Sequence, residues 1–458
     1  MMRTFLSRAR DTGRDQGSVP TAAPTSRTGR TRPAACALVL AAALAAPAAV
    51  RAQDPAPDSL RAAELDSLRE RLRRAEDAIE LLREQLAAQA ASGVQTRTRV
   101  RADLFGRVLT NAFYNDAAVN NADVPLFVAT PTTPSGEERP QGGLGASVRQ
   151  TSVGVAVSVS HVLGGDFLGD LQADFFGGQQ PSTGGRNFPL LRVRKARGIV
   201  RWARGELLAG QESPLVADVD PVSVASVGTP GFTAAGNLWL WAPQLRGTLQ
   251  LGTRARLAVQ GAVAAPTTGD PAAPFDTDVD AAEQSKRPVL QLRLRSRWGE
   301  DDTRGEIGVG AHRGWVRSAD GSLVTSEALV VSAEVPLTRV VELRGEVYTG
   351  QALRGLGGGG IGQNLTAAGE PVRDRGGWAQ LDVRPRSYFQ FGAGCGVADP
   401  EDEDVPAGRL RNVVCAAHAI ARPGGGVLVG LEFRRLRTTY AAGPEENDHL
   451  NLAAGFEF

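Results

Sequence analysis

Residues 450–458 read LNLAAGFEF, and this stretch decides the fold. Apolar side chains occupy every second position, while asparagine, glutamate and small residues fill the positions between them. A period of two predicts a β-strand that presents one apolar face and one polar or small face. The apolar face consists of Leu450, Leu452, Ala454, Phe456 and Phe458.

Phe456 and Phe458 indicate which kind of strand this is. A last strand with one apolar face that finishes on an aromatic residue resembles the closing strand of bacterial outer-membrane β-barrels. There the strand is also the signal that the barrel-assembly machinery recognises, so both phenylalanines are expected to form an insertion signal. The alternative is the last strand of a soluble β-sandwich.

Composition argues against a helical or nucleic-acid-binding protein. The 458 residues include 54 glycines and 27 prolines, which is too much glycine for a helical chain. The net charge is +1, but residues 1–52 hold 8 of the 51 basic and 2 of the 50 acidic residues. Without them 43 basic and 48 acidic residues remain, a net charge of −5. No basic block with interleaved aromatic residues is present, so nucleic acid is not an expected partner.

Residues 1–52 read as an export signal. Arginines precede an alanine- and leucine-rich run at 34–50, and Val50-Arg51-Ala52 predicts cleavage after Ala52. No later stretch approaches the 18 consecutive apolar residues of a membrane-spanning helix. The mature chain is therefore expected to be periplasmic, secreted or a β-barrel.

Residues 53–98 are expected to form a periplasmic coiled coil and a linker. Apolar residues recur at spacings of three and four along a predicted helix from Asp58 to about Ala91, which is a heptad seam. Opposite charges at the flanking positions favour a parallel homo-oligomer, while the alternative is a helix that packs back on its own domain. The seam consists of Leu65, Leu68, Leu72, Ala75, Ile79, Leu82 and Leu86.

Residues 99–458 show the alternation of long and short connections that is typical of a membrane barrel. Short alternating segments are separated by eight long and seven short breaks in turn, and the long ones include 313–325 and 441–447. About 16 antiparallel strands with long connections outside and short connections inside are typical of an outer-membrane β-barrel. The segment 290–295 agrees, because leucines alternate there with Gln291, Arg293 and Arg295. The fold class is therefore all-β, a transmembrane barrel preceded by a short coiled-coil helix.

Several stretches resemble the DcaP-like porins. The resemblance implies a periplasmic coiled coil before a trimeric 16-stranded barrel, and passive diffusion of small organic anions such as dicarboxylates. Lys195-Ala196-Arg197 departs from the His-Ala-Tyr that the family tends to carry. The matching stretches are RVRADLFGRVLTNAFY (99–114), LQADFFGG (171–178), LRVRKARGIV (191–200), LLAGQ (207–211) and PQLR (243–246).

Chemistry motifs are nearly absent. No G-x-S-x-G, P-loop or H-E-x-x-H motif occurs, so no catalytic residue, cofactor or metal site is expected. Gly357, Gly359 and Gly362 match G-x-G-x-x-G, but without a following helix they predict a flexible outer loop rather than a dinucleotide site. Cys395 and Cys415 could form a disulfide across two adjacent strands or remain two inert thiols.

Basic residues are predicted to line the pore on three strands. Strict alternation along 190–202 would place Lys195 and Arg197 in lipid, and a bulge at Lys195 removes that cost. The inward-facing, anion-selective set is then Arg192, Arg194, Arg197 and Arg201 on this strand, with Arg254, Arg256, Arg293, Arg295 and Arg297 on two later strands.

The third long connection, 212–237, is expected to fold inward and set the constriction. Its carboxylates, Glu212, Asp218 and Asp220, would face the basic wall and create a transverse field that orients anions. In the alternative reading the arginines only keep the interior wet and pair with Glu342 and Glu346. A porin for small anions is thus the leading function, ahead of a nonselective or sugar porin and of a coiled-coil tether between outer membrane and cell wall.

Overall fold

The computed structural model describes residues 94–95, 100–177, 189–252, 257–269, 278–300 and 303–458. The export signal, the heptad seam, Arg254 and Arg256 lie outside these residues. No helix among the described residues has both the length and the hydropathy that would let it cross a membrane.

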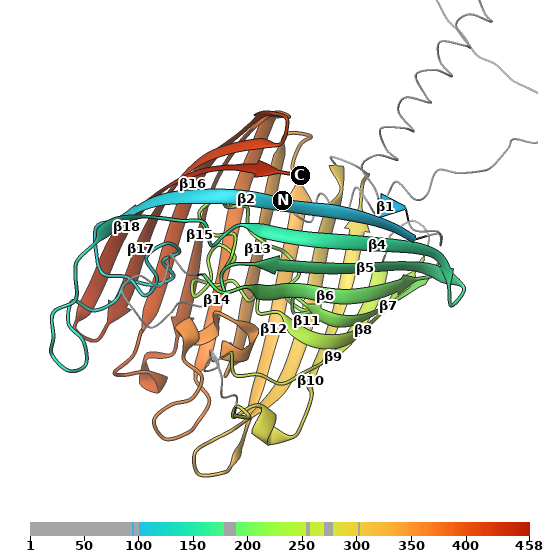
Figure 1. Ribbon diagram of the computed structural model, residues 1–458. Coiled ribbons are helices and arrows are strands. Elements are labelled where there is room, and N and C mark those ends of the chain that lie inside the picture. Colours follow the sequence, from blue (N-terminus) through green and yellow to red (C-terminus); the bar gives the residue numbers. More distant parts are fainter. Residues whose placement is uncertain (1–93, 96–99, 178–188, 253–256, 270–277, 301–302) are drawn as a thin grey trace, which may run out of the picture. The chain divides into compact units, whose positions relative to one another are not determined.

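The described strands form one antiparallel sheet that closes on itself (Figure 1). β18 pairs with β2 from His449 opposite Asn115 to Glu457 opposite Arg107, so the sheet has no free edge at this seam. β3 pairs with one half of β2 and β4 with the other half, so these two short strands fill one position. The result is the expected barrel of 16 positions.

The strand bounds follow the alternating segments of the sequence. The strands are β1 (Val94–Gln95), β2 (Val100–Asn115), β3 (Gly143–Ser147), β4 (Ser152–Val162), β5 (Gly165–Asp174), β6 (Arg192–Arg201), β7 (Gly205–Glu212), β8 (Ala242–Leu251), β9 (Leu257–Ala264), β10 (Val289–Trp298), β11 (Gly305–Arg317), β12 (Leu323–Pro336), β13 (Val341–Gln351), β14 (Arg373–Arg386), β15 (Phe389–Pro400), β16 (Arg411–Gly424), β17 (Val427–Tyr440) and β18 (Gly443–Glu457).

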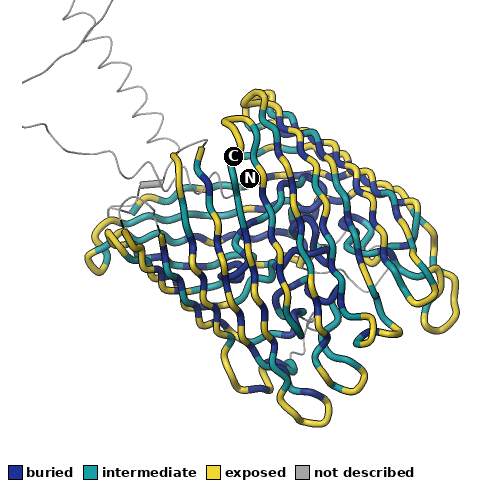
Figure 2. The backbone as a smooth tube through the Cα atoms, turned by 180° about the vertical axis from the view of Figure 1, so that it is seen from behind, coloured by how far each residue is buried: buried dark blue, intermediate teal, exposed yellow. Residues whose placement is uncertain are grey.

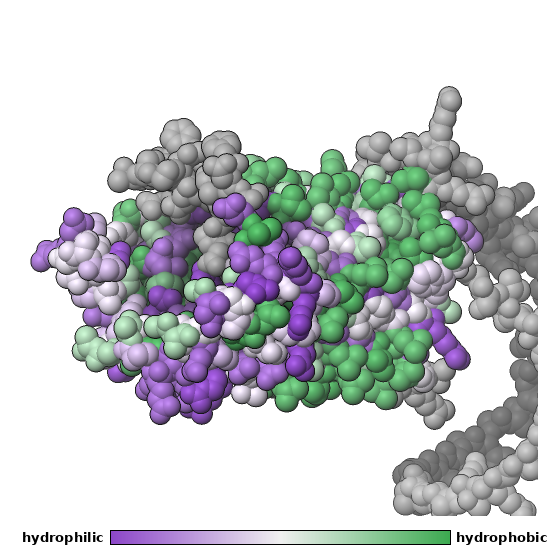
Figure 3. Space-filling view, turned by 90° about the horizontal axis from the view of Figure 1, so that it is seen from below, coloured by the Kyte–Doolittle hydropathy of each residue, from purple (hydrophilic) through white to green (hydrophobic). Residues whose placement is uncertain are grey.

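Side chains alternate between an exposed outer face and a buried inner face along the strands (Figure 2). On β10, Leu290, Leu292 and Leu294 are exposed, whereas Gln291 and Arg293 between them are buried. Figure 3 shows hydrophobic areas beside hydrophilic ones on one face of the barrel. The predicted polarity, apolar outside and polar inside, is therefore confirmed for this strand.

The closing strand follows the same rule. Leu450, Leu452 and Phe456 are exposed on the outer face of β18, while Asn451 and Ala453 are fully buried inside. Phe458 follows the strand and joins the seam, because its backbone N–H donates to Gly106 and its carbonyl accepts from the Gly106 N–H. The Phe456 and Phe458 rings stack at 6.2 Å between centroids.

Connections lie at two ends of the barrel, which we call the loop end and the turn end. The turn end holds tight connections such as 163–164 and 387–388, and the loop end holds long ones such as 213–241. Two expected long breaks are wrong, since β17 and β18 are joined by 441–442 alone and β11 and β12 by 318–322. Polar residues that read as a loop are strand residues here because they pair across strands, as Arg435 does with Glu446 at 2.7 Å.

The segment 352–372 at the loop end is packed rather than loose. It contains the short 3₁₀ turns η4 (Arg354–Leu356) and η5 (Gly359–Gly362). Leu353 and Ile361 are almost fully buried in two apolar clusters, so the glycine-rich motif belongs to an ordered connection. The expected flexible loop is therefore wrong, because neighbouring apolar side chains anchor the glycines.

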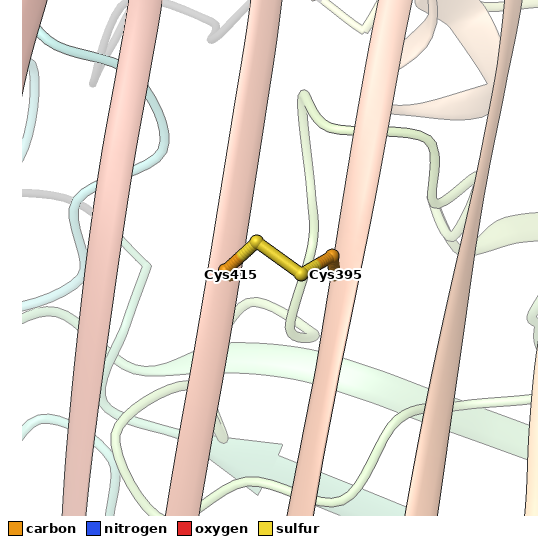
Figure 4. The surroundings of a disulfide bond; sticks show 2 residues. All are labelled: Cys395 and Cys415. Atoms are coloured by element: carbon orange, nitrogen blue, oxygen red, sulfur yellow. A yellow bond between two sulfur atoms is a disulfide. The ribbon is translucent and has the colours of Figure 1, made fainter.

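The two cysteines form a disulfide (Figure 4). Cys395 on β15 and Cys415 on β16 are direct register partners, and their Cα atoms lie 4.1 Å apart. Both strands continue on either side of the bond, so it cross-links one hairpin. Alternation places the pair on the outer face of the barrel, next to Ala393 and Val397.

Candidate permeation pathway

The connection 213–241 folds into the barrel and follows its inner wall, to which its backbone is hydrogen-bonded. The backbone N–H of Leu215 donates to the Gln291 side chain on β10, and that of Val222 to Gln380 on β14. Further along, the N–H of Val224 donates to Glu432 on β17 at 2.9 Å. We call this segment the inner loop. Its predicted inward course is confirmed.

Apolar contacts fix the inner loop to the far wall. Val216 packs with Val330 and Tyr348, and Phe232 stacks on Trp378 with ring centroids 5.7 Å apart. Gly236 passes so close to the Gly377 backbone that a β-carbon would overlap it, and its φ of 95° also favours glycine. Because these contacts are buried, the inner loop is a part of the barrel core.

The bulge in β6 lies one residue before its predicted position at Lys195. Gln172 on β5 pairs with Lys195 and the next residue, Ala173, pairs with Val193, so Arg194 is the extra residue. Val193 is exposed on the outer face, whereas the Lys195 side chain is only 11% exposed. The extra residue thus turns Lys195 and Arg197 toward the lumen and avoids charges in an apolar surface.

Carboxylates accompany the inward basic residues of β6. Arg192 pairs with Asp174 at 2.8 Å, and Arg194 lies 3.5 Å from the same carboxylate. Lys195 pairs with Glu212 at 2.7 Å. Arg197 pairs with Asp170 at 2.6 Å and also contacts Glu212. The β6 cluster consists of Arg192, Arg194, Lys195 and Arg197 with Asp170, Asp174 and Glu212.

Glu212 does not face the basic wall from an opposing loop. It is the last residue of β7, which is the neighbour of β6, and it touches Lys195 and Arg197 directly. Arg201 likewise pairs with Glu206 of β7 at 2.8 Å. The transverse field expected from Glu212 is therefore replaced by local ion pairs, since register places these side chains side by side.

A second basic group lies on β10. Arg293 contacts Asp218 of the inner loop at 3.1 Å and Glu306 of β11 at 2.9 Å, and Arg297 contacts Glu306 as well. Arg295 is buried on the same inner face. The β10 cluster consists of Arg293, Arg295 and Arg297 with Asp218 and Glu306.

The remaining expected acids have other partners. The backbone carbonyl of Asp220 accepts from Arg344, and its carboxylate attracts Arg194 electrostatically. Glu342 pairs with Arg344 and Arg384, and Glu346 accepts from the backbone N–H of Leu238. The predicted arginines do pair with lumenal acids, but their partners include Asp170, Asp174 and Glu306 rather than Glu342 and Glu346.

Aromatic rings complete the surroundings of the β6 cluster, and the sequence reasoning missed them. Arg192 and Arg194 lie over the Trp241 ring at 5.1 and 4.7 Å from its centroid. Arg149 lies 4.0 Å above the Phe176 ring, which Arg192 also approaches. Cation–π contacts of this kind orient guanidinium groups. No sequence spacing shows them, because Trp241 and Phe176 lie in different connections.

Solved structures match this architecture, although neither a protein-family model nor a curated protein matches the chain. The outer membrane channel DcaP of Acinetobacter baumannii superposes with a TM-score of 0.62 at 14% identity, over 80% of this chain and 100% of that one. The chain has a porin fold. The predicted likeness in fold to DcaP is thereby confirmed.

Two further solved structures share the fold. An anion-selective porin from Comamonas acidovorans matches with a TM-score of 0.51 at 13% identity, over 78% of this chain and 100% of its own. OprB of Pseudomonas putida matches with a TM-score of 0.50 at 9% identity, over 78% and 94%. At such identities the likeness concerns the course of the backbone, and the lumenal residues have to be read from this chain.

Proposed function

We propose that the chain is an outer-membrane porin through which small organic anions, dicarboxylates among them, diffuse passively. The observation that supports this proposal is the set of inward arginines on β6 and β10, which border the inner loop inside a closed barrel. The outward leucines and valines suit the hydrocarbon of a membrane, and a wet, charged interior suits a polar path through it. The anion-selective porin from Comamonas acidovorans, similar in fold, adds support.

Arginine suits such a path because it can exchange partners. A guanidinium group binds a carboxylate through two parallel hydrogen bonds, as Arg192 binds Asp174. An entering carboxylate can therefore replace a protein carboxylate without leaving the arginine unpaired. Low-dielectric walls extend the reach of these charges along the lumen.

The same ion pairs limit the selectivity. Four cations face three carboxylates in the β6 cluster, and three face two in the β10 cluster, so each carries a surplus of one positive charge. We therefore expect a several-fold preference for anions rather than exclusion of cations. This pairing is also the observation that favours the second candidate, a nonselective or sugar porin.

The assembly that we propose is a homotrimer in the outer membrane, delivered by the barrel-assembly machinery, with the heptad helix in the periplasm. The heptad seam supports a parallel oligomer, and Phe456 and Phe458 support recognition of the closing strand. No cofactor is needed for diffusion, and no catalytic role is proposed.

The test is reconstitution of the purified protein in a planar bilayer with a KCl gradient. A reversal potential of the sign set by chloride supports the anion porin. A value near zero supports the nonselective porin, and absence of conductance from inserted protein would reject both.

A further inference from the structure

The outer face of the barrel contains a groove that the permeation pathway does not use. It has a volume of about 1140 Å³ and extends across the strands from β7 to β14 near the loop end. Its floor follows one row of register partners, in which Gly247 lies opposite Gly261, Gly261 opposite Leu292, and Leu292 opposite Ala311. The row is low at Gly247 and Gly261, which have no side chain, while Leu292 projects outward between Gly261 and Ala311.

The two glycines leave open space on the outer face. A β-carbon added at Gly247 or at Gly261 would have no neighbouring atom within 4 Å. Neither position needs a positive φ. Backbone strain and close packing therefore do not explain these glycines, whereas a groove that receives another molecule would.

The sides of the groove are apolar. Leu245, Val263 and Leu290 line it and are 52%, 47% and 44% exposed. Leu292 and Leu329 continue this surface and are more exposed still. A hydrocarbon chain that lies along the glycines would bury these side chains and gain their full contact area.

Basic residues gather where the groove approaches the loop end. Arg313 is the register partner of Leu290, and its guanidinium group lies 5.9 Å from the Trp315 ring centroid. Arg287 lies over the same ring at 5.2 Å. Tryptophan with arginine at the edge of an apolar band is typical of the level of lipid headgroups.

Arg373 and Arg375 line the groove farther round the barrel. They pair with Asp404 at 2.9 Å and Asp399 at 3.3 Å, yet their side chains remain 53% and 66% exposed. Glu327 and Glu401 also line this part, so it is mixed in charge. Glu327 is also the register partner of Arg313, so the edge at Arg287 and Arg313 holds two positive charges and one negative charge. Anion binding is expected there because of the surplus of one positive charge.

We propose that this groove binds a phosphorylated glycolipid of the outer leaflet, with an acyl chain along Gly247 and Gly261 and a phosphate at Arg287 and Arg313. This inference rests on the proposed location in the outer membrane. An apolar trough that ends in two exposed guanidinium groups complements a molecule with an apolar chain and an anionic head. A second copy of the chain is the competing occupant, and the test separates the two.

The experiment uses the full mature chain in detergent and titrates it with bisphosphorylated lipid A while native mass spectrometry counts bound lipid. G261L fills the trough, and R287Q with R313Q removes the anion contacts. We expect R287Q with R313Q to weaken binding about tenfold, as for the loss of one hydrogen bond to a charged group. G261L should weaken binding as well, because the added side chain occupies the space of the acyl chain. A454L and the pair R435Q with R437Q are matched controls on the outer face of β17 and β18, and they should bind as the parent does.

Two results would overturn the proposal. Unchanged lipid binding by both groove variants would show that the groove is not the site, and a smaller oligomer in G261L would assign it to a subunit contact. Single-channel conductance of the same samples tests the porin function separately, because Gly261 and Arg313 lie on the outer face and Arg287 lies over the ring of Trp315 on that face. Loss of lipid binding by the groove variants with the conductance of the parent supports the groove site. Absence of conductance in the parent rejects the porin function, but the lipid-binding measurements still test the groove site.

Discussion

Replacing Arg192, Arg194 and Arg197 together by glutamine should convert the β6 cluster from anion-attracting to cation-attracting. In the parent, four cations face Asp170, Asp174 and Glu212, a surplus of one positive charge. In the variant Lys195 alone faces the three carboxylates, a deficit of two. The net change is three charges on one side of the lumen.

The size of the effect follows from Coulomb's law with screening. A unit charge about 10 Å from the ion path changes the energy of a monovalent ion in water by about 0.4 kcal/mol, which a Debye length of about 10 Å at 0.1 M salt reduces to about 0.15 kcal/mol. Three charges give about 0.5 kcal/mol, and because cations and anions respond with opposite sign, the permeability ratio should shift about fivefold. With a Debye length of about 3 Å at 1 M salt the shift should nearly vanish.

The assay is the reversal potential of single channels in asymmetric KCl, at low and at high salt. Because Asp170 and Glu212 lose buried partners, which can cost about 3–5 kcal/mol for a pair, folding is checked first by heat-modified mobility on gels. The matched control R192Q with D174N removes one pair without changing net charge and should keep the parental reversal potential. An unchanged value for the folded triple variant in dilute salt would refute the view that these arginines border the ion path.

Four further outcomes are expected. Deletion of residues 58–90 should leave an inserted barrel whose oligomer dissociates at a lower temperature on native gels, since the heptad seam is lost; an unchanged melting temperature would contradict this. Phe458→Glu should reduce the fraction of protein in the outer membrane, because a charge replaces the aromatic residue that follows the β18 seam with β2. Serine at both Cys395 and Cys415 should lower the unfolding free energy by about 3 kcal/mol, the chain-entropy value for a loop of this size, and a reducing agent should lower the parent's melting temperature but not the variant's. Arg373 donates hydrogen bonds to Asp404 and holds the pKa of that carboxyl below its ordinary value of 3.8; the contact thus stabilises the loop end above that value and is lost as the pH falls through the lowered pKa. The protection factors of the amides in residues 401–409, which are corrected for the intrinsic pH dependence of exchange, should fall between about pH 6 and about pH 2 in the parent, and Asp404→Asn should remove that dependence.

Much of the barrel could be predicted because its signal is local. Alternation along 290–295 and 450–458 is complete within a few residues and needs no partner, and it places Arg293 inward and Leu452 outward without further information. A bulge in β6 could be inferred as well, since only an extra residue lets both Arg192 and Arg197 face the lumen, but alternation did not distinguish Arg194 from the predicted Lys195.

The ion pairs of the β6 cluster were harder to predict, because they depend on the register between strands. Asp170 and Asp174 are four residues apart on β5, and they meet Arg197 and Arg192 only because the bulge takes up one residue. The partners on β5 follow only from the exact position of the bulge, which is Arg194 and not the predicted Lys195. The cysteines were undecided for a similar reason, since a disulfide requires direct register, which hairpin spacing alone suggests but does not prove.

The inner loop has a consequence for how the channel would sort solutes. Its backbone is held by Gln291, Gln380 and Glu432 on three separate strands, and its apolar residues are buried against the far wall. Moving the inner loop aside would break several buried contacts at once. The free energy of this motion should therefore be close to that of unfolding the barrel itself. The inner loop would thus keep the width of the permeation path constant, so the largest solute that can pass would not depend on which solute enters.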